Sequence, residues 1–472
     1  MGQEIPSSRF GDADFAEFRH RLEMETRLLA EWFETEVFSS PSALGGFELE
    51  ACLLDNVADP APHNQRLLED FNDPLVVPEL ATFNVEFNSR VHRMQGSVFS
   101  HMAEELKTRW KRVNERAAQL DLRMGMIGVL PTLKLSALTL ANMSPLNRYR
   151  ALNEQVFRLR NGRPVTLDID GRESLHLSHD DVMLESAATS FQIHLQVNGA
   201  QAADLYNLSK IVSAPMVGVS ANSPYLFGRD LWDETRIPLF EQAISVGASD
   251  LTKRVSFGIR YVYESIMENF TANFLRYPVL LPLLMDEPVE KLAHLRLHNG
   301  TIWRWNRPLI GFDGQGKAQL RIEHRVVPAG PSISDSIANA AFFFGLLSGL
   351  LEDEEKPAEK LSFDRARSNF YAAARRGLQA EVAWFGIEKV ALERLIIEHL
   401  LPIAARGLAK LGVDPYEIEY WLGIITGRVE NQMTGAAWQR AWVASHGPDF
   451  HGLMQAYLEQ QERGRPVHEW PL

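Results

Sequence analysis

Hydrophobic residues in the first two thirds of the chain recur at every second position in several short segments, a spacing typical of half-buried β-strands. The clearest of these segments are residues 47–54, 84–88, 191–198 and 318–327. Each predicted strand has one apolar face and one face of charged or amide side chains. The pattern therefore predicts a sheet that is buried on one side and polar on the other.

The spacing changes after Pro331-Ser332, where hydrophobic residues begin to recur at every third or fourth position, as in amphipathic helices. Asp335, three residues after Ser332, gives this segment a capping-box-like start. Helices are predicted over residues 12–35, 96–120, 200–213, 333–351, 362–376, 384–412, 415–430 and 435–461, and further short strands over 124–129 and 217–221. We therefore expect an α+β protein in which a mixed sheet core (1–330) is covered by a helical part (331–472), forming a single unit over residues 1–472.

The polar strand faces carry acidic side chains, one imidazole and several arginines. They comprise Glu48 and Glu50, Glu79 and Glu86, His194, and Arg321, Glu323 and Arg325. Glu48 and Glu50 share one strand face, where they repel each other unless a cation lies between them. Carboxylates with an imidazole and without thiolates suit Mg²⁺ or Mn²⁺ better than Zn²⁺. Carboxylates around metal ions with arginines opposite are the groups that nucleotide phosphoryl transfer requires.

A different interpretation of the Arg-Glu-Arg row in residues 321–325 is a solvent-exposed strand face with cross-strand ion pairs. A lone strand histidine such as His194 is also more often a structural residue than a ligand. The joint occurrence of several polar strand faces in one chain favours a site over these separate explanations.

The composition and charge of the chain argue against several other classes of partner and site. The net charge of −13 and the pI near 5.6 argue against nucleic acid or an anionic membrane as the main partner. Cys52 is the only cysteine, which excludes disulfide frameworks and cysteine-rich metal sites. The N-terminus has no apolar signal segment, and the apolar run 337–351 is too short to span a bilayer. We therefore expect a cytoplasmic protein without a membrane partner. We expect no P-loop or Rossmann nucleotide site, because neither glycine-rich motif is present.

Several of these motifs occur in an order that resembles a known family. They are Glu48-Leu49-Glu50 after Gly45-Gly46, Glu79 with Glu86, the polar strand with His194, the segment from Ser220 to Gly228, Arg236, and the segment from Leu320 to Arg325. This order is similar to that of the second glutamate–cysteine ligase family (GCS2), a group of carboxylate–amine ligases. The resemblance covers residues 45 to 430.

The resemblance implies a curved, mostly antiparallel sheet of the glutamine-synthetase and guanidino-kinase type, with the active site on its concave polar face. It implies that ATP and Mg²⁺ (or Mn²⁺) convert a carboxylate, glutamate in the type members, to an acyl phosphate, which an amine such as cysteine then attacks. Small-molecule substrates (ATP, an amino acid and an amine) would be the partners, and a homo-oligomer is one option.

The resemblance also implies roles for individual residues. Glu48, Glu50, Glu86, His194 and Glu323 would hold metal, with Glu79 as a further acidic contributor. Arg325 and Arg236 would be catalytic, Arg325 binding phosphate and Arg236 the substrate carboxylate. Arg307, Arg321, Asn222 and Ser223 would complete the substrate- and ATP-binding set.

The sequence departs from the family pattern at three places. The two-histidine strand is here Gln192-Ile193-His194, the acidic residue before Arg307-Pro308 is missing, and Glu234-Thr235 precedes Arg236. These changes leave the substrate open: another amino acid, an amine or a peptide end could replace glutamate or cysteine. Two alternatives to the ligase are a guanidino-type kinase and a non-catalytic, ligase-like protein that binds a metabolite.

Overall fold

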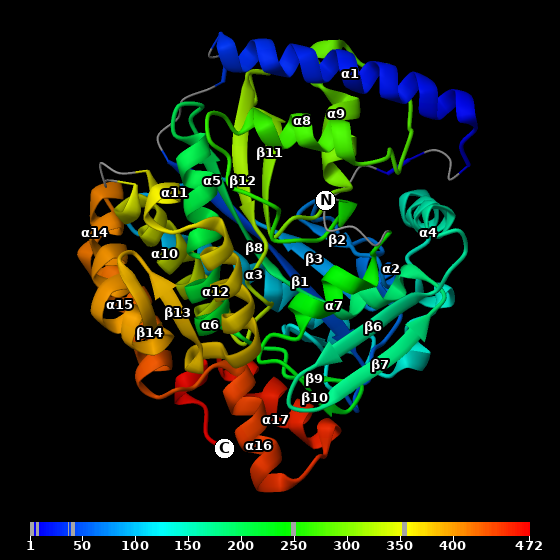
Figure 1. Ribbon diagram of the computed structural model, residues 1–472. Helices are drawn as coiled ribbons and strands as arrows, with labels where there is room; N and C mark the ends of the chain where they lie inside the picture. Colours follow the sequence, from blue (N-terminus) through cyan, green and yellow to red (C-terminus); the bar gives the residue numbers. More distant parts are fainter. Residues whose placement is uncertain (1–3, 6–8, 36, 39–42, 247–251, 352–355) are drawn as a thin grey trace.

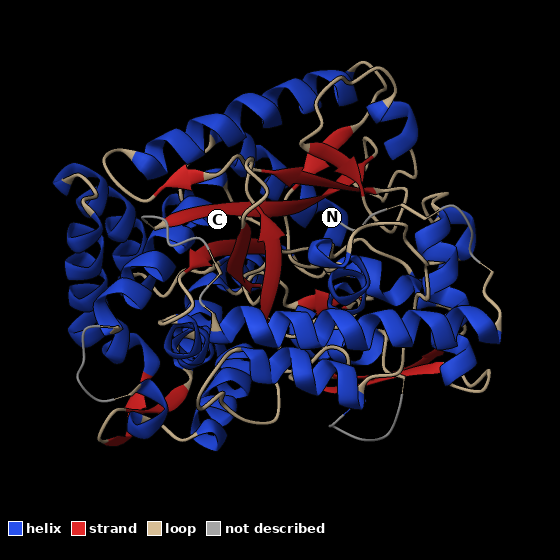
Figure 2. Ribbon diagram, turned by 90° about the horizontal axis from the view of Figure 1, so that it is seen from above, coloured by secondary structure: helices blue, strands red, loops and turns tan. Residues whose placement is uncertain are grey.

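The computed structural model describes residues 4–5, 9–35, 37–38, 43–246, 252–351 and 356–472. Residues 1–3 and 6–8, which entered the prediction that no signal segment is present, lie outside this part. The strands of the large sheet occupy the interior of the molecule and helices surround them, whereas short two-stranded sheets lie at the periphery (Figure 2). This arrangement places the polar strand faces inside the protein.

The described residues form an eight-stranded sheet whose pairs are all antiparallel. Its main path runs β11 (Asn306–Phe312), β12 (Ala318–His324), β8 (Phe191–Val197), β1 (Leu44–Leu54), β3 (Asn84–Asn88) and β2 (Val76–Pro78). Two short strands, β4 (His92–Arg93) and β5 (Arg123–Gly125), also pair with β1. The sheet curls into a half-barrel, which confirms the predicted fold class.

The apolar face of the sheet packs against α10 (Ile333–Leu350), with α3 (Val98–Ala118) and α5 (Ala202–Ile211) beside it. The ring of Phe343 stacks on His324 of β12 with 4.2 Å between centroids. A Cβ on Gly45 would lie 2.5 Å from the ring of Phe344, so glycine is required where β1 meets α10. This close contact fixes the sheet against the helical layer.

Helix α10 begins as predicted, because Ser332 Oγ accepts a hydrogen bond from the Asp335 N–H at 3.1 Å. It is the one helix in the described part of the chain that is long and apolar enough to cross a membrane, and 89% of it is buried inside the protein. It crosses α14 (Leu401–Leu411) at backbone contact, since a Cβ on Gly407 would meet the Gly345 carbonyl. Burial on all sides therefore explains its apolar composition.

The remaining C-terminal elements complete the helical part. They are α11 (Pro357–Lys360), α12 (Phe363–Arg376), β13 (Glu381–Trp384), β14 (Ile387–Ala391), α13 (Leu392–Leu395), a π-helical turn (Ile396–Leu400), α15 (Pro415–Glu430), α16 (Gly435–His446) and α17 (Phe450–Arg463). Helices α16 and α17 lie at the end of the molecule opposite α1 (Asp12–Glu34) (Figure 1).

Four predicted elements differ from the structure. Residues 217–220 belong to a helix, α6 (Ser213–Ser220), and Ala221 follows its end. The helix is buried on every side, so its short apolar run has no periodicity to separate helix from strand. The predicted helix 384–412 begins with the β13–β14 hairpin. The predicted helix 435–461 breaks at Gly447, where φ is +85°. The strand predicted over 124–129 is limited to β5.

The polar face of the sheet is covered by α4 (Asn147–Leu159), a 3₁₀ segment (Val182–Ala187), α8 (Met267–Arg276) and α9 (Ala293–Gly300). Helix α1 packs across α8 and α9 (Figure 1), and buried Glu25 accepts hydrogen bonds from the His294 ring (2.6 Å) and the Leu295 N–H (2.7 Å). The other elements of this half are α2 (Asn64–Leu68), β6 (Val165–Asp170), β7 (Ser174–His179), β9 (Tyr225–Leu226), β10 (Arg229–Asp230) and α7 (Arg236–Ala243).

Candidate active site

The antiparallel register places the polar side chains in rows that run across the strands. In one row Glu323 of β12 lies opposite His194 of β8 and Arg307 of β11. In the next row Gln192 lies opposite Glu48. A further row pairs Glu50 with Glu86 of β3. Because directly opposite residues share a face, these polar groups converge on one side of the sheet.

Glu48, His194 and Glu323 form a compact metal-ligating group: one ligand atom from each lies within 4.8 Å of the others. The His194 Nε2 lies 3.2 Å from Glu48 Oε1 and 4.0 Å from Glu323 Oε1. Within the described residues, the buried Glu48 Oε2 and His194 Nδ1 have no hydrogen-bond partner. Buried polar atoms without partners are costly, and a divalent cation would satisfy this donor set of two carboxylates and one imidazole. The residues therefore fit a Mg²⁺ or Mn²⁺ ion.

Glu323 also takes part in a buried ion-pair network. Its carboxylate accepts two hydrogen bonds from Arg307, at 2.8 Å (Nε) and 2.9 Å (Nη2), and one from Arg325 at 3.1 Å. Burial opposes the ionised form, but the guanidiniums of Arg307 and Arg325 outweigh it and hold the pKa of Glu323 well below its ordinary value. The cross-strand ion pair of the alternative interpretation thus exists, but it is buried and shares Glu323 with the metal-ligating group.

Glu50, Glu79 and Glu86 form a second acidic cluster beside the first. Glu50 accepts hydrogen bonds from the Ser190 N–H (2.7 Å) and Gln192 Nε2 (2.9 Å), yet burial raises its pKa to about 7. The pKa of Glu79 lies well above its ordinary value, mainly because the carboxyl is buried and also because of the charges of Glu86 and Glu50. The structure therefore places the predicted ligands Glu50, Glu86 and Glu79 next to the compact group and not within it.

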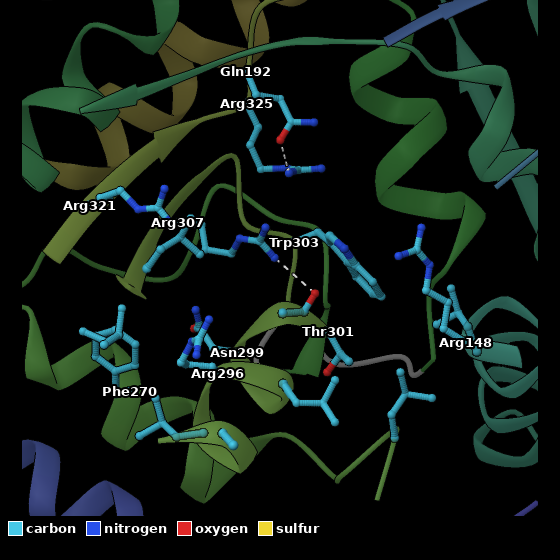
Figure 3. A pocket seen from close by; sticks show the side chains of 18 of the residues that line it. Arg148, Gln192, Phe270, Arg296, Asn299, Thr301, Trp303, Arg307, Arg321 and Arg325 are labelled. Carbon is cyan, nitrogen blue, oxygen red and sulfur yellow. Dashed lines mark hydrogen bonds between the residues drawn. The ribbon is translucent and has the colours of Figure 1, made fainter. Parts of the chain in front are cut away.

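A cavity of about 320 Å³ lies over this face and is bounded below by strands and above by the covering helices. Arg325 and Gln192 lie toward one side of it and Phe270 toward another (Figure 3). Its size is in the range of small-molecule sites. The polar lining residues are Glu50, Glu79, Arg148, Tyr149, Glu185, Gln192, Glu287, Arg296, Asn299, Thr301, Arg307, Arg321 and Arg325.

Comparison with known proteins identifies the family of this fold. The sequence profile described as glutamate–cysteine ligase family 2 (GCS2) matches residues 44–412. The chain belongs to this family. The search of curated proteins found no significant sequence match to this chain.

Two solved structures share its fold. One is a glutamate–cysteine ligase from Francisella tularensis in complex with AMP, at 13% identity and a TM-score of 0.56, covering 92% of this chain and 91% of that one. The other is a bifunctional glutathione synthetase from Pasteurella multocida, at 12% identity and a TM-score of 0.50, covering 92% of this chain and 55% of that one. The GCS2 protein is therefore a ligase with this fold.

Three predicted substrate-binding residues of the GCS2 protein do not line the cavity. The Arg236 guanidinium is 2% exposed; it donates to Glu234 Oε1 (3.1 Å) and to the carbonyls of Arg325 (3.2 Å) and Val326. Asn222 bonds the Ala329 carbonyl and Tyr457 (2.8 Å each), and Ser223 Oγ accepts from the Arg236 N–H at 3.2 Å. In the structure Arg236, Asn222 and Ser223 therefore make contacts within the protein, and their contacts with substrate stay a prediction.

The cavity also contains residues that the sequence did not reveal. Arg148 and Tyr149 come from the first turn of α4, Glu185 from the 3₁₀ segment, and Arg296 from α9. None of them lies on an alternating strand face, so no sequence pattern marked them as part of the site. Tyr149 connects to the predicted set directly, because its hydroxyl donates to Glu79 at 3.2 Å.

Glu185 provides a test of the acidic cavity through stability. Burial, then the charge of Glu50, raise its pKa from the ordinary 4.5 to about 8. The folded protein therefore keeps a proton that the unfolded chain releases, and stability falls as the pH rises from about 4.5 to about 8. Glu185→Gln stays neutral at every pH. We therefore expect the difference in melting temperature between this variant and wild type to grow by a few degrees in the variant's favour across this interval, and to stay constant above it. Differential scanning calorimetry from pH 5 to 9 measures this; a pH-independent difference would contradict it.

Proposed function

We propose that this protein is an ATP- and Mg²⁺-dependent carboxylate–amine ligase that activates an amino-acid carboxylate, with the glutamate γ-carboxyl as the first candidate, and joins it to an amine such as cysteine. Family membership supports the ligase activity, and the AMP bound to the Francisella enzyme supports an adenine nucleotide as co-substrate. Glutathione biosynthesis in the cytoplasm is the corresponding setting, with residues 1–472 acting as one catalytic unit.

The observation that carries the proposal is the group of Glu48, His194 and Glu323 beside an arginine-lined cavity. A Mg²⁺ ion held there would neutralise charge on the phosphates of ATP. Arg325 lies on the same strand face, two residues from Glu323, and its guanidinium would bind the phosphoryl group during transfer. Gln192, which replaces a family histidine, accepts a hydrogen bond from Arg325 and donates one to Glu50 at 2.9 Å. It therefore orients two of the site's charged groups.

The proposed reaction has two steps, the formation of an acyl phosphate and its reaction with the amine. An oxygen of the substrate carboxylate attacks the γ-phosphorus, the bond to the β-phosphate oxygen breaks, and ADP leaves. The amine nitrogen then attacks the acyl carbon, loses a proton, and releases inorganic phosphate. The acyl phosphate is a much better electrophile than the carboxylate, which is why ATP is consumed.

Phosphate release distinguishes this function from its alternatives. We expect purified protein with Mg²⁺ and ATP to release ADP and inorganic phosphate only when a carboxylate and an amine are both present. The screen begins with glutamate and cysteine and extends to other amino acids and amines. ADP without free phosphate would indicate a guanidino-type kinase. Tight amino-acid binding without any nucleotide turnover would indicate a non-catalytic binding protein.

His194 provides a direct test of the metal site. Replacing His194 by asparagine removes the imidazole from the compact group, and we expect the affinity for Mn²⁺ to fall about 10-fold or more. Electron paramagnetic resonance measures free Mn²⁺ without requiring turnover.

His176→Asn is the matched control, because His176 belongs to an exposed group with Asp168 and Asp170 on the β6–β7 hairpin. Loss of Mn²⁺ binding in the His176 variant, with retention in the His194 variant, would place the ion on the hairpin and contradict the proposed site.

A further inference from the structure

Helix α1 precedes the part of the chain that the family profile matches, yet it supports the cavity. The profile begins at residue 44, after the end of α1. The helix packs across α8, α9 and the 3₁₀ turn Val289–Lys291 (Figure 1). Helix α9 in turn contributes Leu295 and Asn299 to the cavity wall. The position of this wall therefore depends on an element that the family profile does not describe.

Two polar side chains of α1 make the contacts with this wall. Arg21 and Glu25 lie four residues apart, so they share one face of the helix. Glu25 is 3% exposed, and its two carboxylate oxygens accept hydrogen bonds from the His294 ring (2.6 Å) and the Leu295 N–H (2.7 Å). Arg21 Nη1 donates to the Met285 carbonyl at 2.9 Å. Helix α1 thus holds both α9 and the loop that precedes it.

The hydrogen bonds at His294 have one consistent direction. The Met285 N–H donates to Nε2 at 3.2 Å, so Nε2 carries no proton. The neutral ring therefore has its proton on Nδ1, which donates to Glu25 Oε1. The ring of Phe18 packs on the imidazole in a T-shaped contact, with 5.2 Å between centroids. The imidazole thereby connects the carboxylate of Glu25 to the backbone of the loop.

The loop and the helix that are joined in this way form adjacent parts of the cavity wall. Glu287 of the loop and Leu295 of α9 both line the cavity. Between them Leu292 has a φ of +48°, in the left-handed region that residues other than glycine seldom adopt. Such a conformation persists only where the surrounding contacts fix it. The hydrogen bonds from α1, which lie on both sides of this residue along the chain, supply such contacts.

We propose that Glu25 is a positioning residue for ligand binding in the cavity. Acting through His294 and Leu295, it holds α9 and the preceding loop in the place that ligand binding requires. The metal-ligating group lies on β1, β8 and β12 and does not depend on it. The inference rests on the proposed ligase function only for its effect on turnover. In the ligase, loss of Glu25 would weaken the binding of a substrate that contacts this wall and leave the chemistry on the strands in place.

Glu25→Gln tests the connection, because an amide has one acceptor oxygen where the carboxylate has two. Its NH₂ group would face either the Leu295 N–H or the protonated Nδ1 of His294, so one of the two hydrogen bonds is lost. We expect backbone amides over residues 285–300 to exchange with deuterium at least about 10-fold faster than in wild type, with unchanged exchange in β8. Hydrogen exchange read by mass spectrometry on the full chain measures this without turnover.

Two further variants accompany this measurement. Glu23→Gln is the matched control, because Glu23 pairs with Arg27 on the exposed side of α1, and it should leave the exchange unchanged. Arg21→Met removes the hydrogen bond to the Met285 carbonyl from a partly exposed side chain. This variant takes the place of Glu25→Gln if the latter does not fold, and it should speed exchange over residues 285–292 about 3-fold or more.

The kinetics of the active enzyme separate positioning from a general loss of structure. We expect Glu25→Gln to raise the KM of one substrate about 10-fold, while kcat and the affinity for Mn²⁺ change less than about 3-fold. His294→Gln should have a similar effect. Because Glu25 acts through His294, the KM of the double variant should lie less than about 3-fold above that of the weaker-binding single variant.

The outcomes decide between the roles. Unchanged exchange over residues 285–300 in a folded Glu25 variant would overturn the proposal. A parallel loss of kcat and of Mn²⁺ affinity, or effects of the two substitutions that multiply, would overturn it as well. Faster exchange over this segment in a protein that releases no phosphate with any substrate would support the positioning role of Glu25 and reject the ligase function.

Discussion

Replacing Glu323 by glutamine is expected to reduce ligase turnover at least about 100-fold and to destabilise the protein at the same time. The substitution removes a carboxylate that lies in the compact metal-ligating group and accepts hydrogen bonds from Arg307 and Arg325. Both guanidiniums are buried, with side-chain exposures of 3% and 9%, and each would lose an ionised hydrogen-bond acceptor. Phosphate release measures the first effect and thermal unfolding the second.

Glu388→Gln is the control for this variant, because Glu388 pairs with Arg365 on the surface, at 2.8 Å. We expect no measurable change from it, since exposed pairs contribute about 0–1 kcal/mol. Mn²⁺ binding by the folded Glu323 variant separates loss of the metal site from loss of fold. Turnover close to that of wild type would remove Glu323 from the active site.

Replacing Arg428 by methionine is expected to cost about 3–5 kcal/mol of unfolding free energy without changing the KM of any substrate. Arg428 lies on α15 and is 1% exposed; its guanidinium donates to the Val219 carbonyl and Asn339 Oδ1, both at 2.8 Å, and lies 3.4 Å from Asp335. It thereby joins α15 to α6 and α10. Its loss leaves the Asp335 carboxylate buried without its cation.

Urea denaturation measures this loss, with Arg365→Met as the surface control. A decrease below about 1 kcal/mol would mean that the pair behaves like an exposed one. A changed KM with unchanged stability would mean that the helical layer acts on the cavity. Either result would contradict the structural role assigned to Arg428.

The strands that form the floor of the site could be predicted because their alternation is local. Glu48, His194 and Glu323 each lie on a polar strand face that the sequence shows directly. Their convergence depends on strand order and register, which place Glu323 opposite His194 and bring β8 next to β1. Spacing alone does not determine that register; the resemblance to the family implied that the polar groups meet on one face of the sheet, without giving the register.

Other parts could not be predicted for identifiable reasons. Motif order placed Arg236 near the site but gave no information on where its guanidinium points, and it points to backbone carbonyls. Glu185 and Arg296 lie on a short 3₁₀ segment and on one turn of a helix, where an acidic or basic residue is ordinarily a solvated one. The cross-strand pair between Arg307 and Glu323 joins residues of neighbouring strands whose register no sequence pattern revealed.

The division of the cavity between a strand floor and a helical cover has a consequence for how new specificities arise. The groups assigned to metal and phosphate come from β1, β8 and β12, whereas Phe270, Leu295 and Arg296 come from α8 and α9. Exchanging residues of α8 and α9 would therefore alter which molecule is accepted while leaving the chemical machinery in place. Directed evolution aimed at a new acid or amine should concentrate its libraries on these two helices and leave the strands untouched.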